Sequence, residues 1–173
     1  PCLTLKRTIS GRLGEAALQI HDEVINEGNT AAPLMLLYHF NFGWPLVDEG
    51  TDIIWKGTHR VASDPQLLGV KDIKKCPQPL ELHQGSGESV IYIDPEADAE
   101  HKVHCGLWNK ERELGLHITF DKRELPCLTN WHHFAEQEYV TGIEPGTNPP
   151  IGQKAARESN TLTRLAPGEK KEL

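Results

Sequence analysis

The stretch LGLHITFD, residues 114–121, decides the fold class because its side chains alternate between apolar and polar. Leu114, Leu116, Ile118 and Phe120 would face one way, and the residues between them would face the other way. A period of two is typical of a β-strand with one buried face, whereas no stretch of a dozen residues shows the apolar spacing of an amphipathic helix. The sequence therefore predicts an all-β protein.

Similar short segments lie on both sides of this stretch, separated by turns rich in Gly, Pro and Asn such as residues 145–150. Their spacing favours a large antiparallel β-sandwich. Residues 34–41 are apolar at nearly every position, so we expect a strand covered on both faces. Residues 61–78 are irregular, as in a long loop or a short helical turn, and residues 169–173 are expected to form a frayed end. The other predicted strands are Leu3–Ile9, Leu18–Val24, Glu88–Asp94, His101–Asn109, Leu128–His133, Tyr139–Glu144 and Thr161–Leu165.

Length and charge limit the classes of protein to which the chain could belong. The 173 residues suffice for one domain, and the formal net charge of -7 argues against a nucleic-acid partner. The most apolar stretch, residues 33–42, is too short to span a membrane, and no signal-peptide pattern is present. The four cysteines form no zinc or CxxC spacing, which indicates reduced thiols in a cytoplasmic protein.

The first candidate site residue is His39, within LLYHFNFGWP (residues 36–45). A histidine between two aromatic residues on a buried strand needs a hydrogen-bond partner, because burial of an unpaired polar ring is unfavourable. Gly43 and Pro45 would end the strand nearby, at a point where sites tend to open. One interpretation is a core histidine with satisfied hydrogen bonds; the other is a general acid.

The second candidate is Glu144, which follows a β-type segment and precedes a loop of Pro, Gly and Asn residues. A carboxylate at the mouth of a sandwich is partly desolvated, and desolvation raises its pKa and makes it a usable base. An exposed glutamate at a strand end is the alternative.

Aromatic and polar side chains alternate around Trp131, as in the wall of a sugar-binding site. We predict no metal site, because the neighbouring His132 and His133 would point to opposite faces, and so would His101 and His104. Nor does the sequence contain the pattern of a serine nucleophile or a paired catalytic thiol.

Several long segments resemble the aldose 1-epimerase family of the galactose mutarotase-like superfamily, and most closely a bacterial aldose-epimerase-like branch of it. The similarity extends over most of the chain in the same order. The segments are LGEAALQIHDEVINEG, LLYHFNFGWPLVDEG, ELPCLTNWHHF, YVTGIEPGTNPP and TLTRLAPGE.

The resemblance implies a galactose mutarotase-like sandwich and an isomerase of carbohydrate metabolism that needs no metal or organic cofactor. His39 matches the family's general acid and Glu144 its general base. The base would take the proton of the C1 hydroxyl while the acid protonates the ring oxygen. A sugar or sugar derivative would be the substrate. Residues expected to bind it are Asn41, Asp94, Asn109 and Trp131, with Asp121 as the fallback for the carboxylate.

Family members are about twice as long, so the chain resembles their C-terminal half. It would then hold part of a pocket and lack activity alone. We expect it to associate with the missing N-terminal half of the same protein, or with a second copy, because cutting a sandwich exposes strand edges and an apolar face.

Two other functions stay open. A non-catalytic carbohydrate-binding sandwich would keep the fold without turnover, and it would not need His39 and Glu144 about one sugar ring apart, as we expect for an epimerase. A cupin-like metal enzyme is the third, and it would need several histidines and a glutamate converging on one ion.

Overall fold

A computed structural model of the chain, which describes residues 2–61 and 69–173, confirms that the fold is antiparallel β-sandwich. The sequence predicted a single domain. The structure distinguishes two compact units, one formed by residues 1–35 with 151–173 and the other by residues 36–150. None of the helices in the described ranges is long and apolar enough to cross a membrane.

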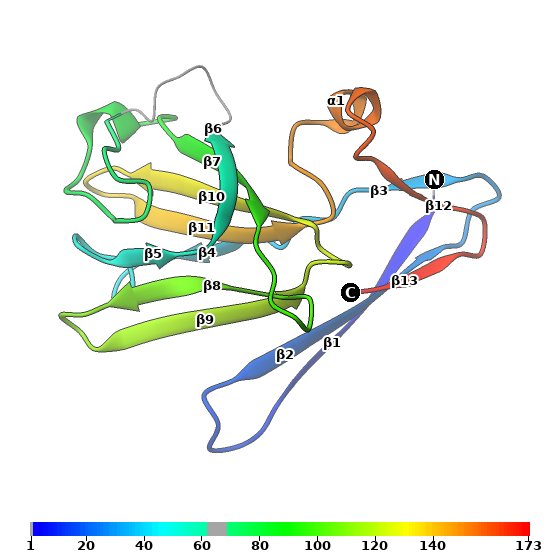
Figure 1. The fold of residues 1–173 in the computed structure, drawn as a ribbon, viewed down its shortest axis with the longest axis horizontal. Coiled ribbons are helices and arrows are strands. Elements are labelled where there is room, and N and C mark those ends of the chain that lie inside the picture. The colour runs from blue at the N-terminus through cyan, green and yellow to red at the C-terminus, as the bar shows by residue number, and fades with distance from the viewer. Residues whose placement is uncertain (1, 62–68) are drawn as a thin grey trace. The chain divides into compact units, whose positions relative to one another are not determined.

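The first unit contains a three-stranded sheet in the order β1-β2-β13, a two-stranded sheet of β12 and β3, and the short helix α1. Strands β1 and β2 form a long hairpin paired over nine positions (Figure 1). The predicted frayed end at 169–173 is wrong: residues 170–172 pair with β2, and Lys170 Nζ lies 2.6 Å from a Glu23 carboxylate oxygen. The bounds are β1 Leu3–Gly11, β2 Leu18–Asn26, β3 Ala32–Leu34, α1 Gln153–Glu158, β12 Thr163–Leu165 and β13 Lys170–Glu172.

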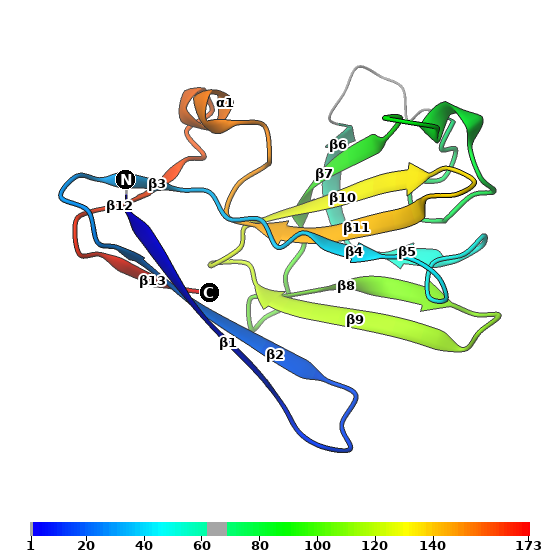
Figure 2. The same cartoon turned by 180° about the vertical axis from the view of Figure 1, so that it is seen from behind.

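The second unit contains a five-stranded sheet in the order β4-β11-β10-β7-β6 and a three-stranded sheet in the order β5-β8-β9. The two sheets form separate layers, which both views of the ribbon show (Figures 1 and 2). The bounds are β4 Phe40–Phe42, β5 Asp52–Ile54, β6 Gly57–Val61, 3-10 helix η1 Glu81–His83, β7 Ser89–Pro95, β8 Lys102–Asn109, β9 Leu114–Asp121, β10 Cys127–Phe134 and β11 Tyr139–Gly146.

Alternation along the strands builds the core of this unit. On one face of the five-stranded sheet lie Ile91, Leu128 and Ile143, each with 1% or less of its surface exposed. The three-stranded sheet contributes Leu107 and Ile53, which are also buried. Removal of this apolar surface from water stabilises the unit and fixes the register of the strands, because a shift of one residue would expose the whole set.

One local expectation requires correction, and three short elements were not predicted. The predicted strand 34–41 is divided into β3 and β4, because the Phe40 N–H bonds to the Tyr38 carbonyl and turns the chain at His39. Strands β5 and β6 and helix α1 were not predicted. Of the irregular region, residues 62–68 lie outside the described residues, while Lys75 within 69–78 forms a bridge to Asp52.

Candidate active site

Strand register gathers the candidate residues on the face of the five-stranded sheet that is opposite the core. Asn41 of β4 lies beside Gly142 of β11, so His39, two residues earlier, lies level with Glu144. Glu144 in turn pairs with Thr129 of β10. The structure therefore brings together the histidine and the glutamate that are 105 positions apart in the chain.

Glu144 is a buried carboxylate, with only 2% of its surface exposed. Burial raises the pKa of Glu144 to about 7; the positive charge of His39 lowers that pKa and the nearby Glu88 carboxylate raises it. Its Oε1 atom lies 3.2 Å from His39 Nδ1 and accepts no hydrogen bond within the described structure. A buried acceptor without a donor is unfavourable and is poised to receive a proton or a hydroxyl group.

Gly142 makes room for this carboxylate. A Cβ atom at position 142 would lie 2.3 Å from Glu144 Oε1, closer than any van der Waals contact allows. A glycine inside a strand often marks such a close approach. Gly142 therefore allows the Glu144 side chain to fold back over the strand.

His39 is half exposed, with 53% of its side chain accessible, which corrects the expected buried position. The tight turn between Tyr38 and Phe40 removes it from the strand. Its Nδ1 atom lies 2.9 Å from Asn41 Oδ1. Because an amide oxygen only accepts, this bond places a proton on Nδ1 and leaves Nε2, on the far side of the ring, for a ligand. The expected separation of about one sugar ring between His39 and Glu144 is not present.

Trp131 and Glu88 form the neighbouring wall. The indole N–H of Trp131 donates to Glu88 Oε2 at 2.6 Å. The centres of the Trp131 and His39 rings are 6.1 Å apart. An exposed carboxylate beside an indole offers both hydrogen-bond acceptors and an apolar ring face, which is the combination that sugars need.

His133 holds this wall in place. Its ring stacks on Trp131 with the centres 5.7 Å apart and the planes 4° from parallel. Its Nδ1–H donates to the Gly87 carbonyl at 2.7 Å. Gly87 immediately precedes Glu88. Two alternate residues of β10, His133 and Trp131, therefore bond to these two consecutive residues and fix the position of the Glu88 carboxylate.

The other predicted substrate-binding residues lie elsewhere. Asn109 is buried at the end of β8, where it donates to the Leu46 carbonyl. Asp94 is on β7 and exposed, and Lys122 Nζ lies 2.7 Å from its carboxylate. Asp121, the fallback, is on β9 and is held by Arg123 and Lys102, whose hydrogen bonds lower its pKa. Of the expected set, Asn41 and Trp131 are the ones that contact His39.

Sequence reasoning missed Glu88 and Gly142. Glu88 follows the turn GSG at residues 85–87, and a carboxylate that begins a strand after a glycine-rich turn is a usable signal. Gly142 had a clearer signal, since it interrupts a strand two residues before Glu144.

His132, also on this sheet, has a structural role. His132 is fully buried on the core face, and its Nε2 atom bonds to Asn130 Oδ1 at 2.8 Å. Burial lowers the pKa of His132 to about 3, so the ring is neutral. Among residues 2–61 and 69–173, no group of three or more His, Cys, Asp or Glu side chains could hold a metal ion.

Comparison with known proteins places this geometry in context. Residues 1–173 match the family described as "Domain of unknown function (DUF4432)". No curated protein matches the chain. The chain is similar to a solved structure described as a "putative aldose 1-epimerase" from Klebsiella pneumoniae subsp. pneumoniae MGH 78578, with 29% identity and a TM-score of 0.88. The match covers 98% of this chain and 44% of that one.

Two further solved structures share the fold at lower identity. The Slr1438 protein from Synechocystis sp. PCC 6803 has 18% identity and a TM-score of 0.61, over 97% of this chain and 51% of that one. A galactose mutarotase-like protein from Lactobacillus casei ATCC 334 has 19% identity and a TM-score of 0.58, over 99% of this chain and 61% of that one. The chain thus spans about half the length of these structures.

Proposed function

The chain belongs to DUF4432, a family described as a domain of unknown function, and on that premise we propose that it supplies the acid–base pair of an aldose 1-epimerase-like carbohydrate isomerase. The observation that carries the proposal is the buried Glu144 carboxylate, which faces His39 at 3.2 Å with a pKa near 7. A base with a pKa near neutrality removes a proton efficiently at the pH of most cells. The name of the Klebsiella pneumoniae structure supports the same reaction class.

The reaction follows from the two groups. Glu144 accepts the proton of the C1 hydroxyl, and the protonated Nε2 of His39 donates a proton to the ring oxygen. The bond between C1 and the ring oxygen breaks, C1 becomes an aldehyde carbon, and rotation about the C1–C2 bond presents its other face. Ring closure returns both protons and yields the other anomer, so atoms and charges balance without an oxidant or reductant.

The contact between His39 and Glu144 suits this chemistry. The two reacting oxygens are bonded to the same carbon, so the acid and the base need not be a whole sugar ring apart. Nδ1 faces Glu144 and Asn41, whereas Nε2 lies on the far side of the imidazole. The base and the acidic nitrogen are therefore separated by the width of that ring.

Glu88 and Trp131 would bind the remaining hydroxyl groups and one face of the sugar. Glu88 is exposed and already accepts a hydrogen bond from Trp131. We propose that Glu88, rather than Asp94, is the carboxylate that holds the substrate, because Asp94 is paired with Lys122.

A second candidate is a non-catalytic carbohydrate-binding protein. It is favoured by the short distance of 3.2 Å between His39 Nδ1 and Glu144 Oε1, since we expected an epimerase to hold the two groups about one sugar ring apart. In that case Trp131 and Glu88 bind a sugar, and the pair serves only to shape the site.

Proton exchange between anomers, measured by NMR over a panel of aldoses, tests the proposal in the intact protein. We expect accelerated interconversion of at least one sugar, reduced about 10²–10⁴-fold by His39→Ala and by Glu144→Gln. His21→Ala, an exposed histidine of β2, is the matched control and should leave the rate unchanged. Sugar-dependent line broadening without acceleration would establish the binding protein instead. If no sugar shows either accelerated interconversion or line broadening, both proposed functions are overturned.

A further inference from the structure

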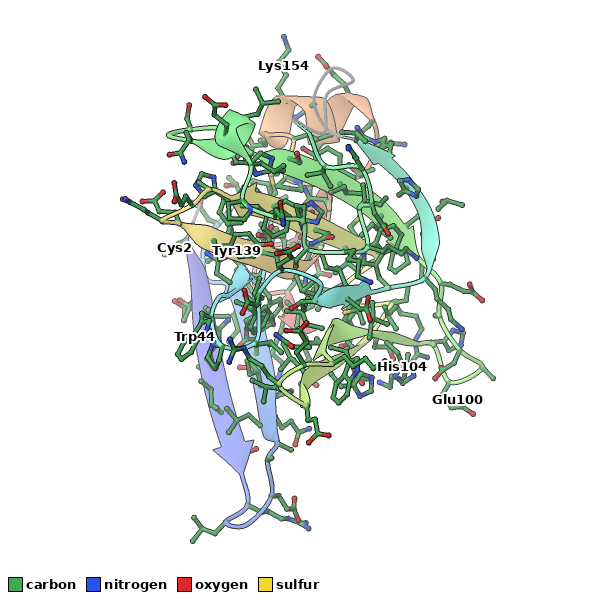
Figure 3. The ribbon with its side chains drawn as sticks, turned by 90° about the vertical axis from the view of Figure 1, so that its left-hand side faces the viewer. Cys2, Trp44, Glu100, His104, Tyr139 and Lys154 are labelled. Carbon is green, nitrogen blue, oxygen red and sulfur yellow. The ribbon has the colours of Figure 1, made fainter. Side chains whose placement is uncertain are left out.

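The outer face of the three-stranded sheet carries a second histidine site. A hollow of about 420 Å³ lies over β5, β8 and β9. Its floor includes Gly106 and Gly115, and Trp108 borders it, 40% exposed. Two histidines, His104 and His117, also line it. Figure 3 shows His104 at the surface of the molecule.

Strand pairing brings the two histidines together. Thr119 of β9 lies directly opposite His104 of β8, and His117 is two positions away on the same face. His104 Nδ1 and His117 Nε2 are 3.1 Å apart. Thr119 Oγ1 lies 3.5 Å from the first nitrogen and 3.4 Å from the second. Three donor atoms thus form a nearly equilateral triangle that faces solvent.

A carboxylate fixes the tautomer of neutral His104. Its Nε2 atom lies 2.8 Å from Asp98 Oδ2, and the backbone N–H groups of Glu100 and Lys102 hold Asp98 Oδ1. Because a carboxylate only accepts, the proton of neutral His104 is on Nε2 and its Nδ1 carries a lone pair. A carboxylate that receives the second N–H of a metal-bound histidine is the usual arrangement in metal sites.

We propose that His104, His117 and Thr119 bind a divalent transition-metal ion, with water molecules completing its coordination. Two imidazole nitrogens bound to one zinc ion are separated by about 2.9–3.4 Å for coordination angles between octahedral and tetrahedral. The 3.1 Å separation of His104 Nδ1 and His117 Nε2 falls in this interval. Imidazole suits zinc, copper and nickel, whereas calcium and magnesium prefer oxygen ligands.

The site differs from a structural zinc centre in having two imidazoles and one hydroxyl. Both imidazoles line the hollow that Trp108 borders. A bound ion would therefore keep positions open to water or to an oxygen donor, as catalytic rather than structural zinc does.

A simple hydrogen bond is the competing account of the same geometry. If His117 carries its proton on Nε2, it donates to His104 Nδ1, and no ion is needed. The two accounts predict different results. If a metal ion binds here, its affinity depends on both imidazole rings and on Asp98, whereas a hydrogen bond alone gives no metal affinity.

Zinc titration by calorimetry at pH 7.5, on protein without an affinity tag, tests the proposal, with cobalt absorption as a second readout. We expect one equivalent of zinc in the wild type. His117→Ala should weaken binding by more than about a hundredfold, and Asp98→Asn by about 10–100-fold. Both residues are exposed, so these variants should fold, and circular dichroism checks that they do.

His21→Ala controls for non-specific binding by an exposed histidine, and it should retain the full affinity. The proposal is overturned if the wild type binds no zinc at about 1 mM. It is also overturned if His117→Ala binds zinc as tightly as the wild type, or if His21→Ala loses as much affinity as His117→Ala.

Discussion

Two histidine–carboxylate pairs lie on opposite sides of the larger unit, and they shift the pKa of their carboxyl groups in opposite directions. His39 and Glu144 are 3.2 Å apart, and His104 and Asp98 are 2.8 Å apart. The pKa of Glu144 is raised to about 7, while the hydrogen bond from His104 lowers the pKa of Asp98.

The opposite pKa shifts follow from the different exposure of the two carboxyl groups to solvent. The Glu144 side chain is 3% exposed, whereas that of Asp98 is 36% exposed and also accepts two backbone hydrogen bonds. Burial disfavours the charged form more than one histidine can offset, but water and N–H donors stabilise it. The buried pair therefore suits proton transfer, and the exposed pair suits the orientation of a ligand atom.

The largest expected effect is on stability. The pKa of Glu144 is higher in the folded chain than its ordinary value of 4.5, so its contribution is present below pH 4.5 and lost as the pH rises through about 7. At pH 8 the buried charge costs about 3 kcal/mol. We expect Glu144→Gln to raise the free energy of unfolding, measured in urea, by up to that amount at pH 8 and by little at pH 5.

Asp98→Asn sharpens this result because its sign is opposite. The lowered pKa of Asp98 means that its carboxylate adds stability at neutral pH and loses that contribution in acid. Asp98→Asn should therefore not stabilise the protein at pH 8. Equal effects of the two substitutions would show that burial does not distinguish the pairs.

The next effect is on the pH dependence of anomer interconversion. Since the base must be ionised, kcat/KM should fall tenfold per pH unit below the pKa of Glu144, to about a hundredth at pH 5. Glu88→Gln removes a negative charge that raises this pKa, so the midpoint should move to lower pH. A midpoint that stays in place in Glu88→Gln would mean that another group titrates.

A smaller effect on kcat is expected when the glycine next to Glu144 is substituted. Gly142→Ala would place a Cβ atom 2.3 Å from Glu144 Oε1 and displace the base, which should lower kcat roughly tenfold. Gly115→Ala is the matched control, because its Cβ atom would press on Trp108 at 2.8 Å, far from the reaction. Similar kcat losses in both variants would indicate general damage to the sheets.

The smallest effect concerns Asp94. Its pairing with Lys122 is exposed, and such pairs contribute about 0–1 kcal/mol. We expect Asp94→Asn to change KM less than twofold, whereas Glu88→Gln should raise KM about tenfold through a lost charged hydrogen bond. A larger KM change in Asp94→Asn than in Glu88→Gln would restore Asp94 as the substrate-binding carboxylate.

Most of the longer strands were predictable because their information is local. The alternation of residues 114–121 indicates β9 directly, and the burial of Phe120 follows from it. The division of residues 34–41 was not predictable, since it depends on a backbone bond between Phe40 and Tyr38 that no apolar pattern encodes.

Side-chain contacts between neighbouring strands were harder to predict from the sequence than the strands themselves. Within one predicted strand, the side chains of His101 and His104 point to opposite faces, so the sequence predicts no metal ion shared by them. The structure instead places His104 beside His117 through the pairing of β8 with β9. Register is set by the whole sheet, so a single strand's sequence does not contain it.

The pairing of β10 with β11 has a consequence for how the chain tolerates insertions and deletions. Eight consecutive residue pairs run from Phe134 and Tyr139 to Cys127 and Gly146. One added residue between Gly142 and Glu144 would turn the carboxylate into the apolar interior now filled by Ile143. Natural or engineered length variation should therefore collect at the strand ends, because fold and chemistry would be lost together within them.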